Sequence, residues 1–94
     1  MIKPPELIEL EKRICKITKE SVKGVNSPTR NKDTVLARFM IWYLANDILK
    51  ISLADIGRMY NRDHTSVMRG INKLKKSTDP KCKVILDEFF AVKE

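Results

Sequence analysis

Five consecutive residues carry side-chain groups suited to reading nucleic-acid bases: Arg62, Asp63, His64, Thr65 and Ser66. A guanidinium can donate to phosphate or guanine, a carboxylate can accept a hydrogen bond from cytosine, and imidazole and hydroxyl groups can contact base edges. An amphipathic helical pattern begins at these residues, and the first residues of a recognition helix are the ones that contact bases in the major groove. The pattern therefore predicts a sequence-reading helix start.

The same residue types also occur at helix starts for structural reasons alone. Asp63 suits an N-cap, and capping explains Asp63 and Ser66 about as well as base contact does. Thr65 can likewise be a helix-start residue and His64 a solvated side chain of the first turn, but Arg62 and His64 are harder to explain in this way. An enzyme that uses His64 as a general base with Asp63 is excluded, because adjacent residues at a helix start do not face each other.

The segment around these residues is one-sidedly basic. Residues 57–76 contain six cationic side chains and one carboxylate, which gives a net charge of +5. A merely solvated helix face usually mixes charges of both signs. The whole chain carries a net charge of +7, which favours a polyanionic partner but does not by itself separate DNA, RNA, a membrane surface and mere solubility.

The apolar periodicity predicts an all-α fold, because no segment alternates at the period of two that is typical of strands. With 94 residues, 43% of them apolar, residues 1–94 are expected to form one domain of five to six helices. The expected helices span about residues 5–20, 34–49, 53–60 and 64–76, with a last helix that starts at Asp79-Pro80. Residues 21–32 are rich in turn formers and should form a loop that carries Arg30 and Lys32.

Several side chains are assigned to caps or to the core. Asp33 is predicted to cap the helix over residues 34–49, and Ser52 with Asp55 has the spacing of a capping box. Core positions are predicted on the central helix for Phe39, Trp42 and Tyr43, with Trp42 partly exposed, and on the last helix for Val84, Ile85, Phe89 and Val92.

Two short helices, about residues 53–60 and 64–76, are joined by a turn of about three residues. This spacing matches a helix-turn-helix, in which the second helix enters a major groove. Gly57 lies in the first of these helices, where glycine costs about 1 kcal/mol relative to alanine. Its presence predicts a close approach of a neighbouring helix.

The cysteines and the amino terminus place further limits on function. Cys15 and Cys82 lack CxxC spacing and are far in sequence from the single histidine, whereas a structural zinc site needs about four ligands. We expect buried, reduced cysteines, no metal and a cytosolic protein. No apolar stretch is long enough for a signal peptide or for a membrane span, which needs about 20 residues.

Two segments carry a resemblance to a known family. Leu53-Ala54-Asp55-Ile56-Gly57 and Arg62-Asp63-His64-Thr65-Ser66-Val67 are similar to the signature of the C-terminal duplex-binding domain of DnaA, the bacterial replication initiator. That pattern runs roughly as L-x-E-I-G, a short aromatic and glycine linker, then R-D-H-T-T-V. The resemblance extends from the first helix through Lys76.

The resemblance implies roles for particular residues. It implies base contacts in the major groove from Arg62, Asp63, His64 and Thr65, and a minor-groove contact from Arg30. Phosphate contacts are predicted for Lys32, Arg38, Ser66, Arg69 and Lys73. This chain departs from the family in two places: only Asn61 separates Tyr60 from Arg62, one linker residue fewer, and Asn46 replaces a phosphate-contacting lysine.

We therefore predict a protein that binds double-stranded DNA as a monomer at sites like those of the initiator, in replication initiation or its regulation, with the nucleoid in the cytoplasm. The chain has no G-x-x-x-x-G-K-[ST] loop, so neither ATP nor another cofactor is expected, and neither is an enzymatic activity. A start at Met1 favours a free-standing domain. The alternative is a protein-interaction module that binds the replication initiator or another replication protein. An exposed Trp42 and the apolar last helix would support this alternative.

Overall fold

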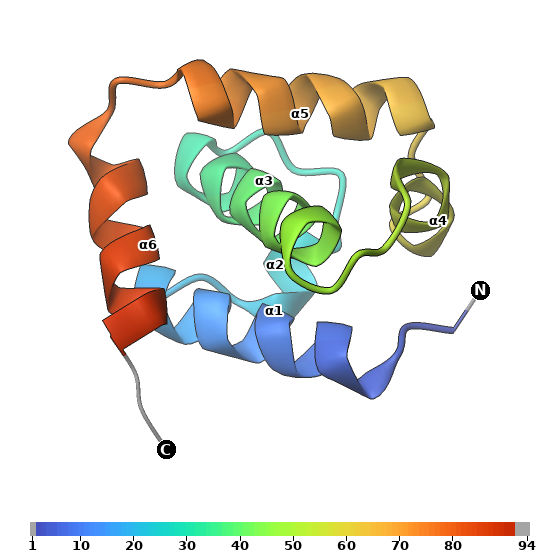
Figure 1. The fold of residues 1–94 in the computed structure, drawn as a ribbon, viewed down its shortest axis with the longest axis horizontal. Helices are drawn as coiled ribbons and strands as arrows, with labels where there is room; N and C mark the ends of the chain where they lie inside the picture. Colours follow the sequence, from blue (N-terminus) through green and yellow to red (C-terminus); the bar gives the residue numbers. More distant parts are fainter. Residues whose placement is uncertain (1, 92–94) are drawn as a thin grey trace.

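The computed structural model describes residues 2–91, and all regular structure in this range is helical. The helices are α1 (Pro5–Thr18), α2 (Val22–Val25), α3 (Lys32–Asp47), α4 (Leu53–Met59), α5 (His64–Lys76) and α6 (Pro80–Ala91). Helix α3 runs through the middle of the molecule, with α5 above it, α1 below it, and α4 and α6 at opposite sides (Figure 1). The predicted all-α, five- to six-helix fold is confirmed.

The sequence of α3 explains its central place. Ala37, Met40, Ile41, Leu44 and Ala45 are fully buried along one face of this helix. Trp42 is 2% exposed, and Leu36, Phe39 and Tyr43 on the remaining side pack partly buried against the core, so apolar residues cover much more than one stripe. A helix that is apolar on most of its circumference must be enclosed by other elements. The surrounding helices supply fully buried partners from their own apolar stripes: Leu7 and Ile14 of α1, Ile56 of α4 and Val67 of α5.

Helix starts differ from the prediction where two good caps lie close together. The side chain of Asn31, not Asp33, accepts hydrogen bonds from the backbone amides of Asp33 and Thr34, so α3 begins at Lys32. Asn and Asp are about equally good N-caps, and the sequence alone cannot rank them. Ser52 does accept from the Asp55 amide, which is one half of the predicted capping box, whereas the Asp55 carboxylate accepts from the Arg58 guanidinium at 2.8 Å.

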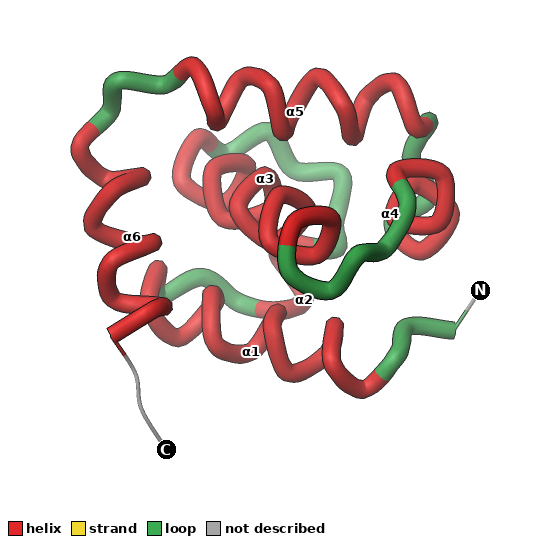
Figure 2. Tube along the Cα trace, viewed as in Figure 1, coloured by secondary structure: helices red, strands yellow, loops and turns green. Residues whose placement is uncertain are grey.

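The segment predicted as one loop contains a short helix. Ser21 caps α2 by accepting a hydrogen bond from the Gly24 amide. Four residues are too few to show the 3.6-residue periodicity from which helices are predicted. The remainder of the segment, residues 26–31, is a loop that connects α2 to α3 and is drawn in green in Figure 2.

Trp42 is part of the core, and its predicted partial exposure is wrong. Only 2% of the residue is exposed, and its ring lies 5.6 Å from the ring of Phe39 and 5.9 Å from that of Tyr60. Gly70 of α5 allows this burial, because a Cβ there would lie 2.7 Å from Phe39 Cδ1 and 3.2 Å from Trp42 Cε3. The lack of a side chain at Gly70 therefore lets α5 cover Trp42.

Helix α6 packs on α1 through part of its predicted inner face. Ile85 and Phe89 are buried, whereas Val84 is 53% exposed, and Val92 lies outside the described residues. The Arg13 guanidinium of α1 lies 4.1 Å from the Phe89 ring and donates to the Phe89 carbonyl at 2.8 Å. Cys15 and Cys82 are both buried and free, as expected. Between residues 2 and 91, no helix is both long and apolar enough to cross a membrane.

Candidate nucleic-acid interface

The turn between α4 and α5 lies directly against the backbone of α4. The Arg62 amide donates to the Gly57 carbonyl at 2.7 Å, and a Cβ at Gly57 would lie only 2.5 Å from the Arg62 carbonyl oxygen. Gly57 therefore permits a close approach, but the segment that comes closest is the turn and not the neighbouring helix that was predicted. Asn61 has φ of 55°, in the left-handed region that Asn enters more readily than most residues. Glycine and asparagine together make this tight turn possible.

The residue before this turn is fixed to the opposite side of the molecule. Tyr60 is buried, and its hydroxyl donates to the buried Glu11 carboxylate of α1. Lys3 approaches the same carboxylate at 2.6 Å and lies 4.2 Å above the Tyr60 ring. Burial, and secondarily the bond to Glu11, raise the pKa of the Tyr60 hydroxyl far above its usual value. The end of α4 is thus held by contacts that sequence motifs did not indicate.

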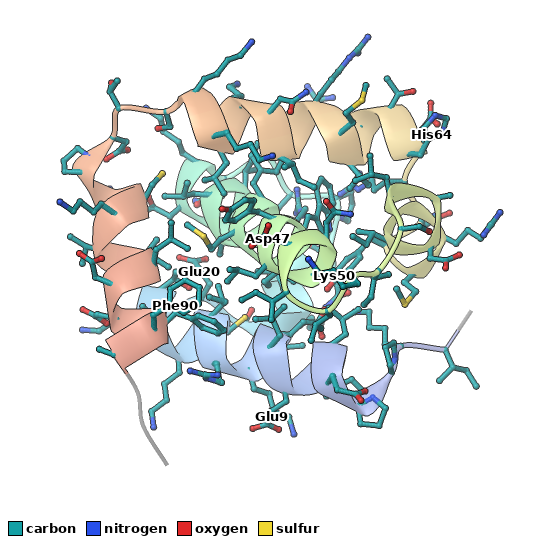
Figure 3. The ribbon with its side chains drawn as sticks, in the orientation of Figure 1. Glu9, Glu20, Asp47, Lys50, His64 and Phe90 are labelled. Atoms are coloured by element: carbon teal, nitrogen blue, oxygen red, sulfur yellow. The ribbon has the colours of Figure 1, made fainter. Side chains whose placement is uncertain are left out.

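Asp63 and His64 stand in solvent at the start of α5, where Figure 3 shows His64 beside the turn. Asp63 occupies the N-cap position, but its side chain makes no capping hydrogen bond, so this predicted role is wrong. Its carboxylate lies 3.3 Å from Nδ1 of His64, so these adjacent side chains do meet, and the expectation that they would not face each other is wrong. The two side chains are 69% and 64% exposed. The carboxylate and Nε2 of the imidazole therefore face outward and are free for contact with a partner.

Helix α5 presents a basic face beside the turn. Its buried stripe consists of Val67, Gly70, Ile71 and Leu74. A groove between α5 and α3 is lined by four cationic residues and no acidic one; its polar lining residues are Arg38, Arg62, Ser66, Arg69 and Lys73. The predicted phosphate-contacting residues of α5 are thus brought to one groove together with Arg62.

Two more cations lie near this groove: Arg30 in the loop before α3, and Lys32, which was predicted in that loop but is the first residue of α3. Arg30 and Lys32 are exposed and line an adjoining hollow, to which Lys73 also contributes. The loop touches the turn directly, because an Arg62 Nη2 donates to the Ser27 carbonyl at 3.3 Å. The structure therefore brings the predicted minor-groove residue and the predicted major-groove residues to one side of the molecule.

Arg38 is the exception among the predicted phosphate contacts. It is only 5% exposed, and its guanidinium donates to the carbonyls of Val25, Ser27 and Thr29 at 2.9, 2.7 and 3.3 Å. Burial, and then the nearby Arg62, lower the pKa of the Arg38 guanidinium below its ordinary value. Nε and Nη2 of Arg38 thus hold this segment, which gives the residue a structural role, and its predicted contact with phosphate stays a prediction.

Two further residues refine the surface. Asn46 donates from Nδ2 to the Ile51 carbonyl at 2.9 Å, so it holds the loop before α4 where the family pattern has a lysine. Met68 is 42% exposed and follows His64 by one helical turn. The position of Met68 on the polar side of the α5 helical wheel was the signal that could have identified it.

The motif consists of the short helix α4, a tight turn, and α5 packed against α4, with an exposed polar start and a basic flank. These features define the class of helix-turn-helix proteins. Comparison with known families agrees with this assignment: the model described as "Bacterial dnaA protein helix-turn-helix" matches residues 8–74. The chain belongs to this family. Among the described residues, no three His, Cys, Asp or Glu side chains are grouped to hold a metal ion.

Several curated relatives carry the name chromosomal replication initiator protein DnaA. The one from Streptococcus mutans serotype c is 35% identical over 68 residues, which is 71% of this chain and 15% of the relative. The one from a Thermotoga species, strain RQ2, is 34% identical over 86 residues, or 88% of this chain and 19% of the relative. The chain thus spans less than a fifth of the length of these relatives.

Proposed function

We propose that this protein binds double-stranded DNA sequence-specifically, at sites like those of the bacterial replication initiator, and acts in replication initiation or its regulation. The observation that carries the proposal is the grouping on one side of the molecule of Asp63, His64, the acid-free basic groove and the Arg30 loop. Family membership supports the same conclusion. The protein then has no enzymatic role, needs no cofactor and works with the nucleoid in the cytoplasm.

In this proposal the start of α5 enters the major groove. Arg62, Asp63, His64 and Thr65 contact base edges: Asp63 orients the His64 ring from 3.3 Å and accepts from cytosine, and the Thr65 methyl packs on a thymine methyl. Met68, exposed on the next turn, offers a second apolar contact. Because the carboxylate of Asp63 does not cap the helix, base contact does not compete with a structural role.

The basic groove beside α5 supplies the phosphate contacts. Ser66, Arg69 and Lys73 of α5 and Lys32 at the start of α3 bind the DNA backbone, which fixes position and orientation without reading sequence. Arg30 enters the minor groove, whose narrow A·T-rich form concentrates negative potential and attracts arginine. A single such module has no two-fold symmetry, so the protein binds an asymmetric site as a monomer.

The test is a fluorescence anisotropy titration at physiological salt against a duplex with an initiator-type site and a duplex of equal length and composition without it. We expect the complete site to bind at least tenfold more tightly, because each well-made base contact contributes about 1–3 kcal/mol. His64→Ala should reduce this ratio, whereas Lys73→Gln should weaken both duplexes alike. Equal affinities of the wild-type protein for the two duplexes would contradict the proposal.

The second candidate is a protein-interaction module that binds the replication initiator or another replication protein. The burial of Trp42 removes one of its two supports. The other is α6, which begins beyond the family match at residue 74 and exposes 53% of Val84 and 59% of Phe90. An Arg62→Ala variant that loses DNA affinity but keeps full activity in the cell would favour this candidate.

A further inference from the structure

One buried side chain joins the two parts of the proposed DNA-reading surface. Arg38 extends from the middle of the molecule to the segment before α3 and donates to three carbonyls there: that of Val25 at the end of α2 and those of Ser27 and Thr29 in the loop. Thr29 directly precedes Arg30. Three charge-assisted hydrogen bonds from one planar guanidinium fix the direction of a segment more strictly than one flexible contact can.

The same loop is also tied to the recognition turn. The Ser27 carbonyl accepts from Arg38 at 2.7 Å and from Arg62 at 3.3 Å. Arg62 in turn is held by its backbone amide, which donates to the Gly57 carbonyl at 2.7 Å. A continuous set of contacts therefore runs from the loop of Arg30 through Ser27 to the first residue of the reading turn.

The loop has few other means of holding its shape. At the start of the loop, Asn26 donates to the Glu11 carboxylate of α1 at 3.3 Å and accepts from Lys3. The further hydrogen bonds of the middle of the loop are local: Ser27 Oγ donates to the Gly24 carbonyl, and Thr29 Oγ1 accepts from the Asn31 amide at 3.2 Å. Pro28 has no amide hydrogen to donate. The Arg38 guanidinium thus connects the middle of this loop to α3, and only 5% of the Arg38 residue is exposed.

We propose that Arg38 is a positioning residue that holds residues 25–30 against the recognition turn, so that Arg30 meets the minor groove at a fixed distance from the bases read by α5. It sets the sequence preference at the edge of the site without touching DNA. This inference rests on the proposed function and deepens it. It assigns specificity to a residue whose charge alone would suggest a phosphate contact.

The test compares binding to three duplexes: the complete site, the same site with its A·T-rich edge replaced by G·C, and the same site with one major-groove base pair exchanged. Edge discrimination is the affinity ratio of the first duplex to the second, and core discrimination is the ratio of the first to the third. Arg30→Ala serves as the reference for lost edge contact. Arg69→Gln, which removes an exposed cation of α5 outside the loop, is the matched control for lost charge.

Arg38→Gln should reduce edge discrimination by about the factor found for Arg30→Ala and leave core discrimination within about twofold of wild type, because an exposed α5 still reads its bases. The double variant of Arg30→Ala and Arg38→Gln should equal Arg30→Ala, since residues that act through one another are not additive. Arg38→Lys, which keeps the charge but loses the planar fork, should show an intermediate edge discrimination. Equal weakening of all three duplexes, as expected for Arg69→Gln, would overturn the proposal, as would unchanged edge discrimination.

A measurement on the wild-type protein keeps the proposal falsifiable if the Arg38 variants do not fold. In NMR spectra, the Nε–H of Arg38 should exchange slowly with water and should keep its position when DNA is added, whereas those of Arg30 and Arg62 should shift. A DNA-induced shift of Arg38 as large as that of Arg30 would overturn the proposal. Wild-type protein that does not distinguish a complete site from an unrelated duplex would overturn the proposed function itself, which separates the two failures.

Discussion

Gly57→Ala tests what fixes the position of the turn between α4 and α5, which carries Arg62 and Asp63. The added Cβ would lie 2.5 Å from the Arg62 carbonyl oxygen and 3.3 Å from the His64 amide nitrogen, whereas Cβ atoms essentially never come closer than 3.0 Å to another heavy atom. Both neighbours are backbone atoms, so no side chain can rotate away. The turn must therefore move by at least about half an ångström relative to α4.

The magnitude follows from two opposing terms. Alanine is favoured over glycine in a helix by about 1 kcal/mol, and overpacking costs about 1–3 kcal/mol. The net loss in free energy of unfolding should be about 0–2 kcal/mol, so the variant folds. The displaced turn should still lose base contacts worth about 1–3 kcal/mol each, which lowers the preference for the complete site by at least about fivefold.

The assay is denaturant unfolding together with competitive binding to duplexes with and without the site. Ile85→Val in α6 is the matched control, since this buried residue lies far from the turn in the fold and its truncation costs about 0.5–1.5 kcal/mol. We expect the control to lose stability but to keep its preference for the site. A Gly57→Ala protein with wild-type preference would refute the reasoning that close approach aims the turn.

Three further predictions concern the Tyr60–Glu11 hydrogen bond, the stability of the protein at alkaline pH and the proposed phosphate contacts. Tyr60→Phe removes the hydroxyl that donates to Glu11 and should cost about 1.5–3 kcal/mol of unfolding free energy in urea, whereas a loss below about 0.5 kcal/mol would show that this bond does not hold the end of α4. Burial, then Glu11 and Glu20, raise the pKa of the Cys15 thiol to about 11 in the folded protein. Above pH 9 the unfolded chain therefore loses this proton while the folded protein keeps it, and the free energy of unfolding should fall as pH rises towards 11. Cys15→Ala should lessen this fall in thermal melts, and an equally steep fall in that variant would exclude this cause. Replacing Lys73 by Gln should lower the slope of log affinity against log salt by about 1, whereas His64→Ala should leave the slope unchanged, and titrations from low to high salt would refute this division if both variants changed it equally.

The sequence predicted the elements that repeat a pattern and missed those that depend on one contact. Helices α1, α3, α5 and α6 followed from apolar spacing, and Gly57 from the rarity of glycine inside a helix. The cap of α3 was misplaced because Asn31 and Asp33 have nearly equal capping strength. Trp42 was misjudged because its cover comes from Gly70, a residue distant in sequence with no side chain of its own.

The candidate site shows the same division. The candidate base-contacting residues stand out in the sequence because they are consecutive and begin a helix, and the structure places Asp63 and His64 in solvent there. Arg38 was assigned to phosphate because sequence reports charge but not burial, and its three carbonyl acceptors lie 9 to 13 residues away. Glu11 and Tyr60 lie 49 residues apart, so no spacing rule could pair them.

Selection of bound duplexes from a random pool tests the central claim most directly, because it asks for DNA binding, sequence preference and family likeness in one measurement. The account predicts that the recovered duplexes share one short asymmetric motif like the site of the initiator, with an A·T-rich edge that disappears from selections with Arg30→Ala. Recovered duplexes without any shared motif would contradict the account.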